Sequence, residues 1–261
     1  MFKKASVAVA VFAFSVSPVL GGLIDTVVDT TPGGATVDAN VNVGEYVGTV
    51  SGGGAGFGNP VGGGTLSVDS DANGIYMGFS SMGDISGNSI VVYFDVAAGG
   101  FADNSTINDN ADFGRGRISS AANPLTYPFD ADYGWTISSA FGGFQALFQL
   151  AAGGDNSLNF AGFGVTADPI GEFPSNSTYE FFIPYVDLGI SAGDTVDFVV
   201  TYGNNNTPAF MSDEGVPNQF VGNPGDGPVA LTDFHRLVTI PEPATMVLLT
   251  IGAVAFIRRR R

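Results

Sequence analysis

Two acidic stretches contain the oxygen-bearing side chains that a hard cation such as Ca²⁺ prefers. The first, DSDANG at residues 69–74, has the spacing that opens an EF-hand loop, in which Asp69, Asp71 and Asn73 would supply ligand oxygens. Position 12 of that loop falls on Ser80 instead of a bidentate Glu, and no helix pattern flanks the stretch. The same letters are typical of a β-hairpin turn closed by Asx hydrogen bonds, and we favour that turn over a Ca²⁺ site.

The second stretch, ADNSTINDNAD at residues 102–112, gathers Asp103, Asp109 and Asp112 in one segment. These carboxylates could hold Ca²⁺ with help from elsewhere in the chain, but a solvated loop is the simpler explanation of the stretch, and we favour it. Ca²⁺ is the single cofactor that the sequence offers. With that exception we expect no cofactor.

An aromatic stretch, YPFDADYGW at residues 127–135, could stack against a sugar ring through Tyr133 and Trp135. The alternative is that these rings fill the core, which we favour because the chain has 22 Phe and a single Trp.

Residues for covalent or acid–base catalysis are scarce. The chain has no Cys, and its one histidine, His235, has no nucleophile elbow beside it. Glycoside hydrolysis by two carboxylates would have four glutamates to choose from, and nothing in the sequence selects a pair. They are Glu45, Glu172, Glu180 and Glu214. We therefore assign no catalytic residue and expect a protein that is not an enzyme.

The elements that would position these side chains are strands. Short runs rich in β-branched and aromatic residues are each bounded by Gly, Pro, Asn or Asp, and the run at residues 89–96 alternates with Ile90, Val92 and Phe94 on one face. The segments 65–68 and 75–79 flank the DSDANG turn and predict a hairpin, whereas 144–150 suits either a strand or a short helix. The pattern predicts an all-β fold, an antiparallel, jelly-roll-like β-sandwich over residues 65–240. Residues 23–64 form a Gly-rich N-terminal segment of the same body.

The charge of the body excludes one class of partner. Three arginines and 24 acidic residues lie between positions 23 and 240, so that part of the chain has a net charge of −21. Such a surface repels phosphate backbones, and we expect no nucleic acid partner.

The two ends of the chain have the pattern of export signals. Residues 1–22 combine Lys3 and Lys4 with an apolar run, which predicts a signal helix that directs the chain to the Sec export machinery. Residues 244–257 are apolar and precede four arginines, so they predict a short transmembrane helix in the inner membrane. The extended triplet Pro241, Glu242 and Pro243 stands just before that helix.

This C-terminal combination, over residues 241–261, resembles the PEP-CTERM sorting signal of Gram-negative bacteria. Pro241, Glu242 and Pro243 match its triplet, and its basic tail is matched by Arg258, Arg259, Arg260 and Arg261. The resemblance implies a membrane-anchored precursor, cleavage by an exosortase, and delivery of the mature form to the cell surface or the exopolysaccharide matrix.

The order of motifs in the body resembles family 9 carbohydrate-binding modules, which are β-sandwiches. The matching positions are Asp69, Asp71, Tyr76, Asp95, Tyr179, Glu180, Ile183 and Pro184. Together the two resemblances imply an exported, non-enzymatic surface or matrix protein whose body binds polysaccharide. A secreted carbohydrate-active enzyme with two carboxylates, or a Ca²⁺-dependent carbohydrate-binding module, are the alternatives.

Overall fold

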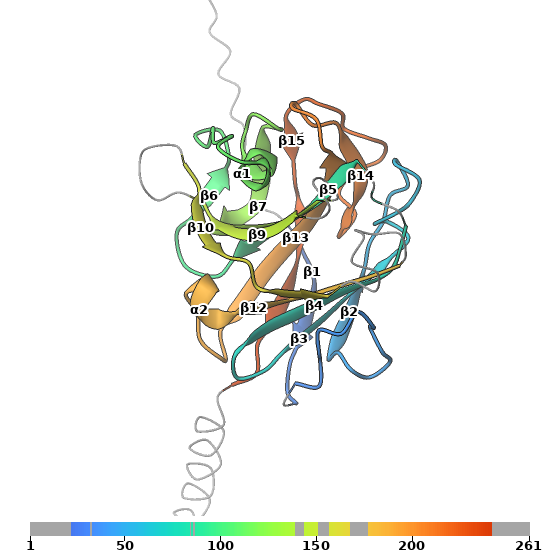
Figure 1. Cartoon of the computed structure of the whole chain (residues 1–261), viewed down its shortest axis with the longest axis vertical. Helices are drawn as coiled ribbons and strands as arrows, with labels where there is room; N and C mark the ends of the chain where they lie inside the picture. The colour runs from blue at the N-terminus through green and yellow to red at the C-terminus, as the bar shows by residue number, and fades with distance from the viewer. Residues whose placement is uncertain are drawn as a thin grey trace, which may run out of the picture.

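The computed structural model describes residues 22–31, 33–83, 85, 87–138, 144–150, 157–167 and 177–241, and these residues form mostly strands (Figure 1). Of the predicted signal helix only Gly22 lies within these ranges, where it begins a strand, and the predicted apolar helix lies outside them. Among the described helices none is long and apolar enough to cross a membrane. The all-β prediction is confirmed, with antiparallel pairing dominant.

The largest sheet, sheet A, has eight strands in the described part of the chain. Its central strands pair antiparallel. The strand of this sheet that comes earliest in the sequence pairs in parallel with the one that comes latest. In order across the sheet these strands are β1 (Gly22–Val28), β16 (Asp233–Val238), β13 (Thr195–Asn204), β5 (Asn88–Asp95), β8 (Tyr133–Ser138), β9 (Phe144–Gln149) and β10 (Asn159–Gly162), and β14 (Met211–Val216) also pairs with β13. The segment at 144–150 is thus a strand and not a helix.

Sheet B packs against one face of sheet A. It is antiparallel and contains the predicted hairpin, because Asp71 N–H donates to Gly74 C=O and closes the turn between β3 (Thr65–Ser70) and β4 (Gly74–Met82). Its strands in order are β11 (Val165–Ala167), β12 (Ser177–Pro184), β4 (Gly74–Met82), β3 (Thr65–Ser70) and β2 (Gly48–Ser51). The short helix α2 (Tyr185–Leu188) follows β12 and ends at Gly189, which has a positive φ of 68°.

A third layer covers the opposite face of sheet A, and the two-sheet prediction did not include it. Figure 1 shows α1 (Phe113–Ile118) and β7 (Leu125–Ala131) on one side of β9 and β13, and β12, β4 and β3 on the other. The layer consists of β6 (Phe101–Asp103), β7 (Leu125–Ala131), β15 (Val229–Ala230) and α1 (Phe113–Ile118).

Sheet A is therefore buried on both faces, and the chain has two cores. Along β5 the side chains alternate between them: Ile90, Val92 and Phe94 pack toward sheet B, whereas Val91 and Tyr93 pack toward the third layer. The alternation on one face was predicted correctly. The burial of the other face explains why β5 carries almost no exposed residue.

The Gly-rich N-terminal segment is part of both sheets, since β1 joins sheet A and β2 joins sheet B. The glycine-rich stretch after β2 wraps around one carboxylate. Glu214 is 2% exposed and accepts hydrogen bonds from the backbone N–H groups of Phe57, Asn59, Val61 and Gly62 at 2.7–3.2 Å. Glycine is required at position 54, where φ is +85° and a Cβ would stand 2.4 Å from the carbonyl oxygen of Asp213.

Candidate functional site

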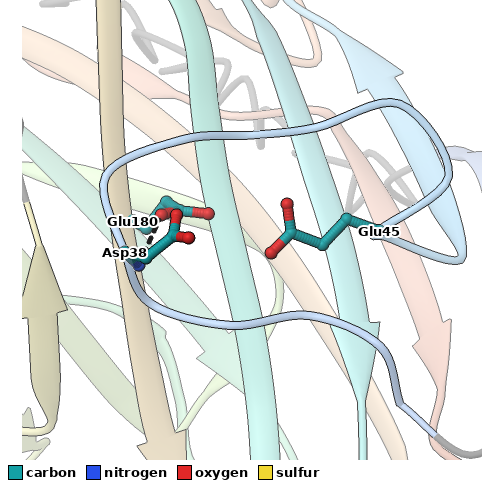
Figure 2. A group of neighbouring side chains, drawn as sticks. All are labelled: Asp38, Glu45 and Glu180. Atoms are coloured by element: carbon teal, nitrogen blue, oxygen red, sulfur yellow. Dashed lines mark hydrogen bonds between the residues drawn. The ribbon is translucent and has the colours of Figure 1, made fainter.

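Three carboxylates meet where the N-terminal segment crosses sheet B. Asp38, Glu45 and Glu180 each present an oxygen, and these atoms lie within 4.8 Å of one another (Figure 2). Glu180 comes from β12 and is fully buried, whereas Asp38 and Glu45 come from the loop that passes over it. Among the described residues this is the one group of three or more potential metal ligands at such distances.

Backbone and hydroxyl donors already occupy much of this acidic cluster. Glu180 accepts hydrogen bonds from Asp38 N–H at 3.0 Å, Asn40 N–H at 3.1 Å and the Tyr46 hydroxyl at 2.6 Å. Glu45 accepts from the backbone N–H groups of Thr36 and Asn42. These donors hold the loop on the sheet, so the cluster has a structural role whether or not a cation joins it.

The same contacts set the ionisation of the cluster. Burial raises the pKa of the Glu45 carboxyl, but its hydrogen bonds to Asn42 and Thr36 outweigh that effect and the pKa is lowered overall. Burial, and then the hydrogen bond to Glu180, raise the pKa of the Tyr46 hydroxyl well above its usual range. A set of carboxylate oxygens of this kind has the chemistry of a Ca²⁺ site.

The residues predicted as Ca²⁺ ligands do not belong to this cluster. Asp69 is 2% exposed and accepts from the N–H groups of Gly34 and Ala35, so it fixes the N-terminal segment. Asp71 accepts from the N–H groups of Asn73 and Gly74 and closes an Asx turn at the hairpin. The DSDANG stretch therefore has the geometry of the favoured turn.

The three aspartates of the second stretch lie in the third layer, on the other side of sheet A from Asp69. Asp103 accepts from Ser105 N–H, and Asp112 is the N-cap of α1, where it accepts from Arg115 N–H. Asp109 accepts from Leu158 N–H at 2.8 Å and lies 3.4 Å from the Arg115 guanidinium. The two acidic stretches thus do not converge on one site.

The two aromatic candidates lie inside the core between sheets A and B. Trp135 has no exposed surface, and its ring stacks on Phe181 at 5.0 Å with an angle of 8° between the planes. Tyr133 is 8% exposed. A sugar cannot reach the faces of the Trp135 ring in this arrangement, because core residues cover them. His235 is also buried, on β16 beside Phe198, and burial lowers its pKa.

An open groove of about 460 Å³, which the sequence did not indicate, lies at the end of sheet A where β5 finishes and β13 begins. Its lining includes Asp95, Asp194, Asp197 and Arg236. Arg236 holds Asp197 through two hydrogen bonds of 2.6 Å. Burial, and then the charges of Asp132, Asp197 and Asp130, raise the pKa of Asp95 to about 7. Cross-strand pairing brings these acids together, and that pairing is invisible in a linear pattern.

The residues directly before the predicted sorting triplet are held by the body. Thr239 is fully buried, its hydroxyl donates to Asp194 C=O at 2.8 Å, and its N–H donates to the same oxygen at 3.0 Å. Ile240 N–H donates to the Ser70 hydroxyl oxygen at 2.9 Å. Pro241 is the last described residue. Glu242, Pro243 and the four arginines lie outside the described residues.

Comparison with known proteins identifies this end of the chain. The family model of the PEP-CTERM protein-sorting motif matches residues 239–261. A search of curated proteins finds no match to the chain. The predicted signal is confirmed, and the chain ends in a PEP-CTERM protein-sorting motif.

Proposed function

We propose that this chain is a non-enzymatic protein of the cell surface or extracellular matrix, whose body adheres to polysaccharide. The motif at residues 239–261 carries the proposal, because it implies an exported protein that an exosortase processes. The signal helix at residues 1–22 would bring the chain to the Sec machinery, and the apolar run would hold the precursor in the inner membrane.

The roles of the buried glutamates support a non-enzymatic body. Glu180 and Glu214 each accept at least three hydrogen bonds from the polypeptide and have 2% exposure or less. A catalytic carboxyl must reach the substrate, and these two are turned into the protein.

An exposed apolar patch supports adhesion. Phe160 on β10 and Phe163 just after it are 47% and 59% exposed, and their ring centroids lie 4.7 Å apart. Val165 and Val186, which follow on β11 and α2, are 54% and 82% exposed. Flat apolar rings grouped on a surface are suited to the C–H faces of sugar rings, and grouped exposure of this kind marks interaction sites.

Intact-mass spectrometry of protein from outside the native cells tests the export and processing. The mature form should lack Arg258, Arg259, Arg260 and Arg261, and Glu242→Ala should leave the precursor uncut if the exosortase recognises that carboxylate. Asp226→Ala removes an exposed acid of the body and should be processed normally. Exterior chains that still carry the arginines would contradict the proposal.

Co-sedimentation of the processed protein with exopolysaccharide from the same cells tests adhesion. The Phe160→Ser, Phe163→Ser double variant should lose binding. The Val43→Ser, Val221→Ser double variant removes two fully exposed apolar side chains elsewhere and should bind normally. Equal binding by both variants would rule out the patch.

The groove at Asp95 favours a second candidate function, a carbohydrate-active enzyme. An acid with a pKa of about 7 in an open groove is suited to general acid catalysis. Release of reducing ends from exopolysaccharide, abolished by Asp95→Asn, would establish this alternative and overturn the non-enzymatic proposal.

A further inference from the structure

One arginine of the body is buried without a carboxylate partner. Arg115 pairs with Asp109 and Asp112, and Arg236 pairs with Asp197. Arg117, at the end of α1, is 8% exposed and makes no ion pair with any described residue. A buried charge is costly unless an opposite charge compensates it, which makes Arg117 the exception to explain.

The hydrogen-bond acceptors around Arg117 are all uncharged, and one of its N–H donors has no acceptor among the described residues. Its terminal nitrogens donate to the carbonyl oxygens of Asn204 and Asn206 and to the Thr207 hydroxyl at 2.6–3.1 Å, and its guanidinium carbon lies 5.0 Å from the centre of the Phe113 ring. The Nε–H group is buried and has no hydrogen-bond partner among the described residues. Burial lowers the pKa of Arg117, but a guanidinium remains charged inside proteins.

Arg117 lines a small cavity between sheet A and the third layer. The cavity measures about 20 Å³, which suits one small ligand and not an oxyanion such as sulfate. Tyr93 and Asn123 also line it, with 0% and 3% exposure, and the apolar walls include Val91 and Leu125.

Two further polar groups at this cavity lack partners within the described part of the chain. Neither amide atom of Asn123 makes a hydrogen bond, and the Tyr93 hydroxyl makes none either, although the Tyr127 ring lies beside it and the Tyr127 hydroxyl lowers the pKa of Tyr93 against the larger effect of burial. Unpartnered buried polar groups are rare in native proteins and usually face a ligand or ordered water. Here a guanidinium N–H, an amide NH₂ and a phenol O–H provide three donors around one cavity.

We propose that this cavity is a binding site for one small monovalent anion of the size of chloride. The anion would accept from Arg117 Nε–H, from the Asn123 amide nitrogen and from the Tyr93 hydroxyl, and it would supply the charge that no described carboxylate supplies. A water molecule would satisfy the hydrogen bonds but leave the charge of Arg117 uncompensated.

Thermal unfolding of the full chain in detergent tests the proposal, with sodium chloride and sodium gluconate compared at equal ionic strength. Gluconate is too large for the cavity and serves as the screening control. Above the dissociation constant, each tenfold increase in chloride should raise the melting temperature by about 3–5 °C more than the same increase in gluconate does.

Asn123→Asp places a carboxylate where the anion would lie, so this variant should no longer respond specifically to chloride. Asn110→Asp adds the same charge at an exposed position near α1 and should respond as the unmodified chain does. An identical melting temperature in chloride and gluconate for the unmodified chain would show that the cavity holds water alone and would overturn the proposal.

Bromide offers a measurement that does not depend on any variant folding. Crystals of the unmodified chain soaked in bromide should show an anomalous peak between Arg117 and Asn123. The proposal is rejected by crystals that show no peak there.

Discussion

Individual carboxylates in this protein mostly serve as acceptors for backbone N–H groups. Asp29, Asp69, Glu180 and Glu214 are all buried, and each holds a segment that lacks regular secondary structure. Charge-assisted hydrogen bonds of this type are about twice as strong as neutral ones. Some of the many acidic residues therefore order the irregular segments of a glycine-rich chain by hydrogen bonding, and do not only give the surface its negative charge.

Glu214→Gln should destabilise the protein markedly. The amide would turn an NH₂ group toward backbone donors, leaving buried N–H groups unpaired, and we expect the free energy of unfolding to fall by about 3 kcal/mol. Chemical denaturation measures this. Glu45→Gln makes the same change in the more exposed acidic cluster and should cost less than about 1 kcal/mol. A similar loss in both variants would contradict the role given to Glu214.

Asp95 should make stability depend on pH. Its pKa rises from 3.8 to about 7 on folding, so the folded state holds a proton that the unfolded state has lost, and stability falls as the pH rises through this window. Asp95→Asn should therefore raise the melting temperature at pH 8 and leave it nearly unchanged at pH 4. Asp226→Asn, at an exposed site, is the control and should show no such difference. A gain for Asp95→Asn that is equal at both pH values would refute the assignment.

At the scale of elements, the sequence predicted the features that depend on the order of neighbouring residues, such as strand alternation and tight turns. The alternation in β5 and the DSDANG turn between β3 and β4 were both evident from neighbouring residues. Two strands of the third layer, β6 and β15, have three and two residues, too few to show a periodic pattern. Its longest strand, β7, overlaps the stretch at residues 127–135 that we considered only for its aromatic rings. The acidic cluster was missed as a group because Asp38 and Glu180 are 142 residues apart, and only the folded sheet brings them together.

The end of β16 lies close to the sorting triplet and should affect the rate at which the precursor is cleaved. Thr239 and Ile240 are tied to Asp194 and Ser70, so the sorting triplet begins without a free linker after β16. We expect a short Gly-Ser spacer between Ile240 and Pro241 to speed cleavage, because the folded body would then hinder the access of the exosortase to the triplet less. Pulse-chase analysis of precursor and mature forms measures this, and the same spacer inserted after Gly222, in an exposed loop, is the control. An unchanged rate of cleavage with the first spacer would mean that the exosortase already reaches the triplet without hindrance from β16.

The whole molecule carries its charge unevenly, and this should affect its stability. With a net charge of −21 between residues 23 and 240, the body repels itself, and salt screens that repulsion. Raising sodium gluconate from about 10 mM to about 200 mM should increase the melting temperature, since the Debye length shortens to less than the size of the domain. A melting temperature that falls or stays constant would show that the acidic groups are already compensated within the fold.

The parallel pairing of β1 with β16 gives the body a direction for mechanical load. Gly22 pairs with Asp233 and Val28 with Val238, so the described chain begins at one end of this strand pair and finishes at the other. A protein held at its C-terminus while a matrix pulls on its N-terminus would have the two strands drawn past each other along their length. Their hydrogen bonds would then bear the force together, whereas a hairpin pulled from its open end breaks them one after another. The fold is thus arranged to resist stretching between its termini.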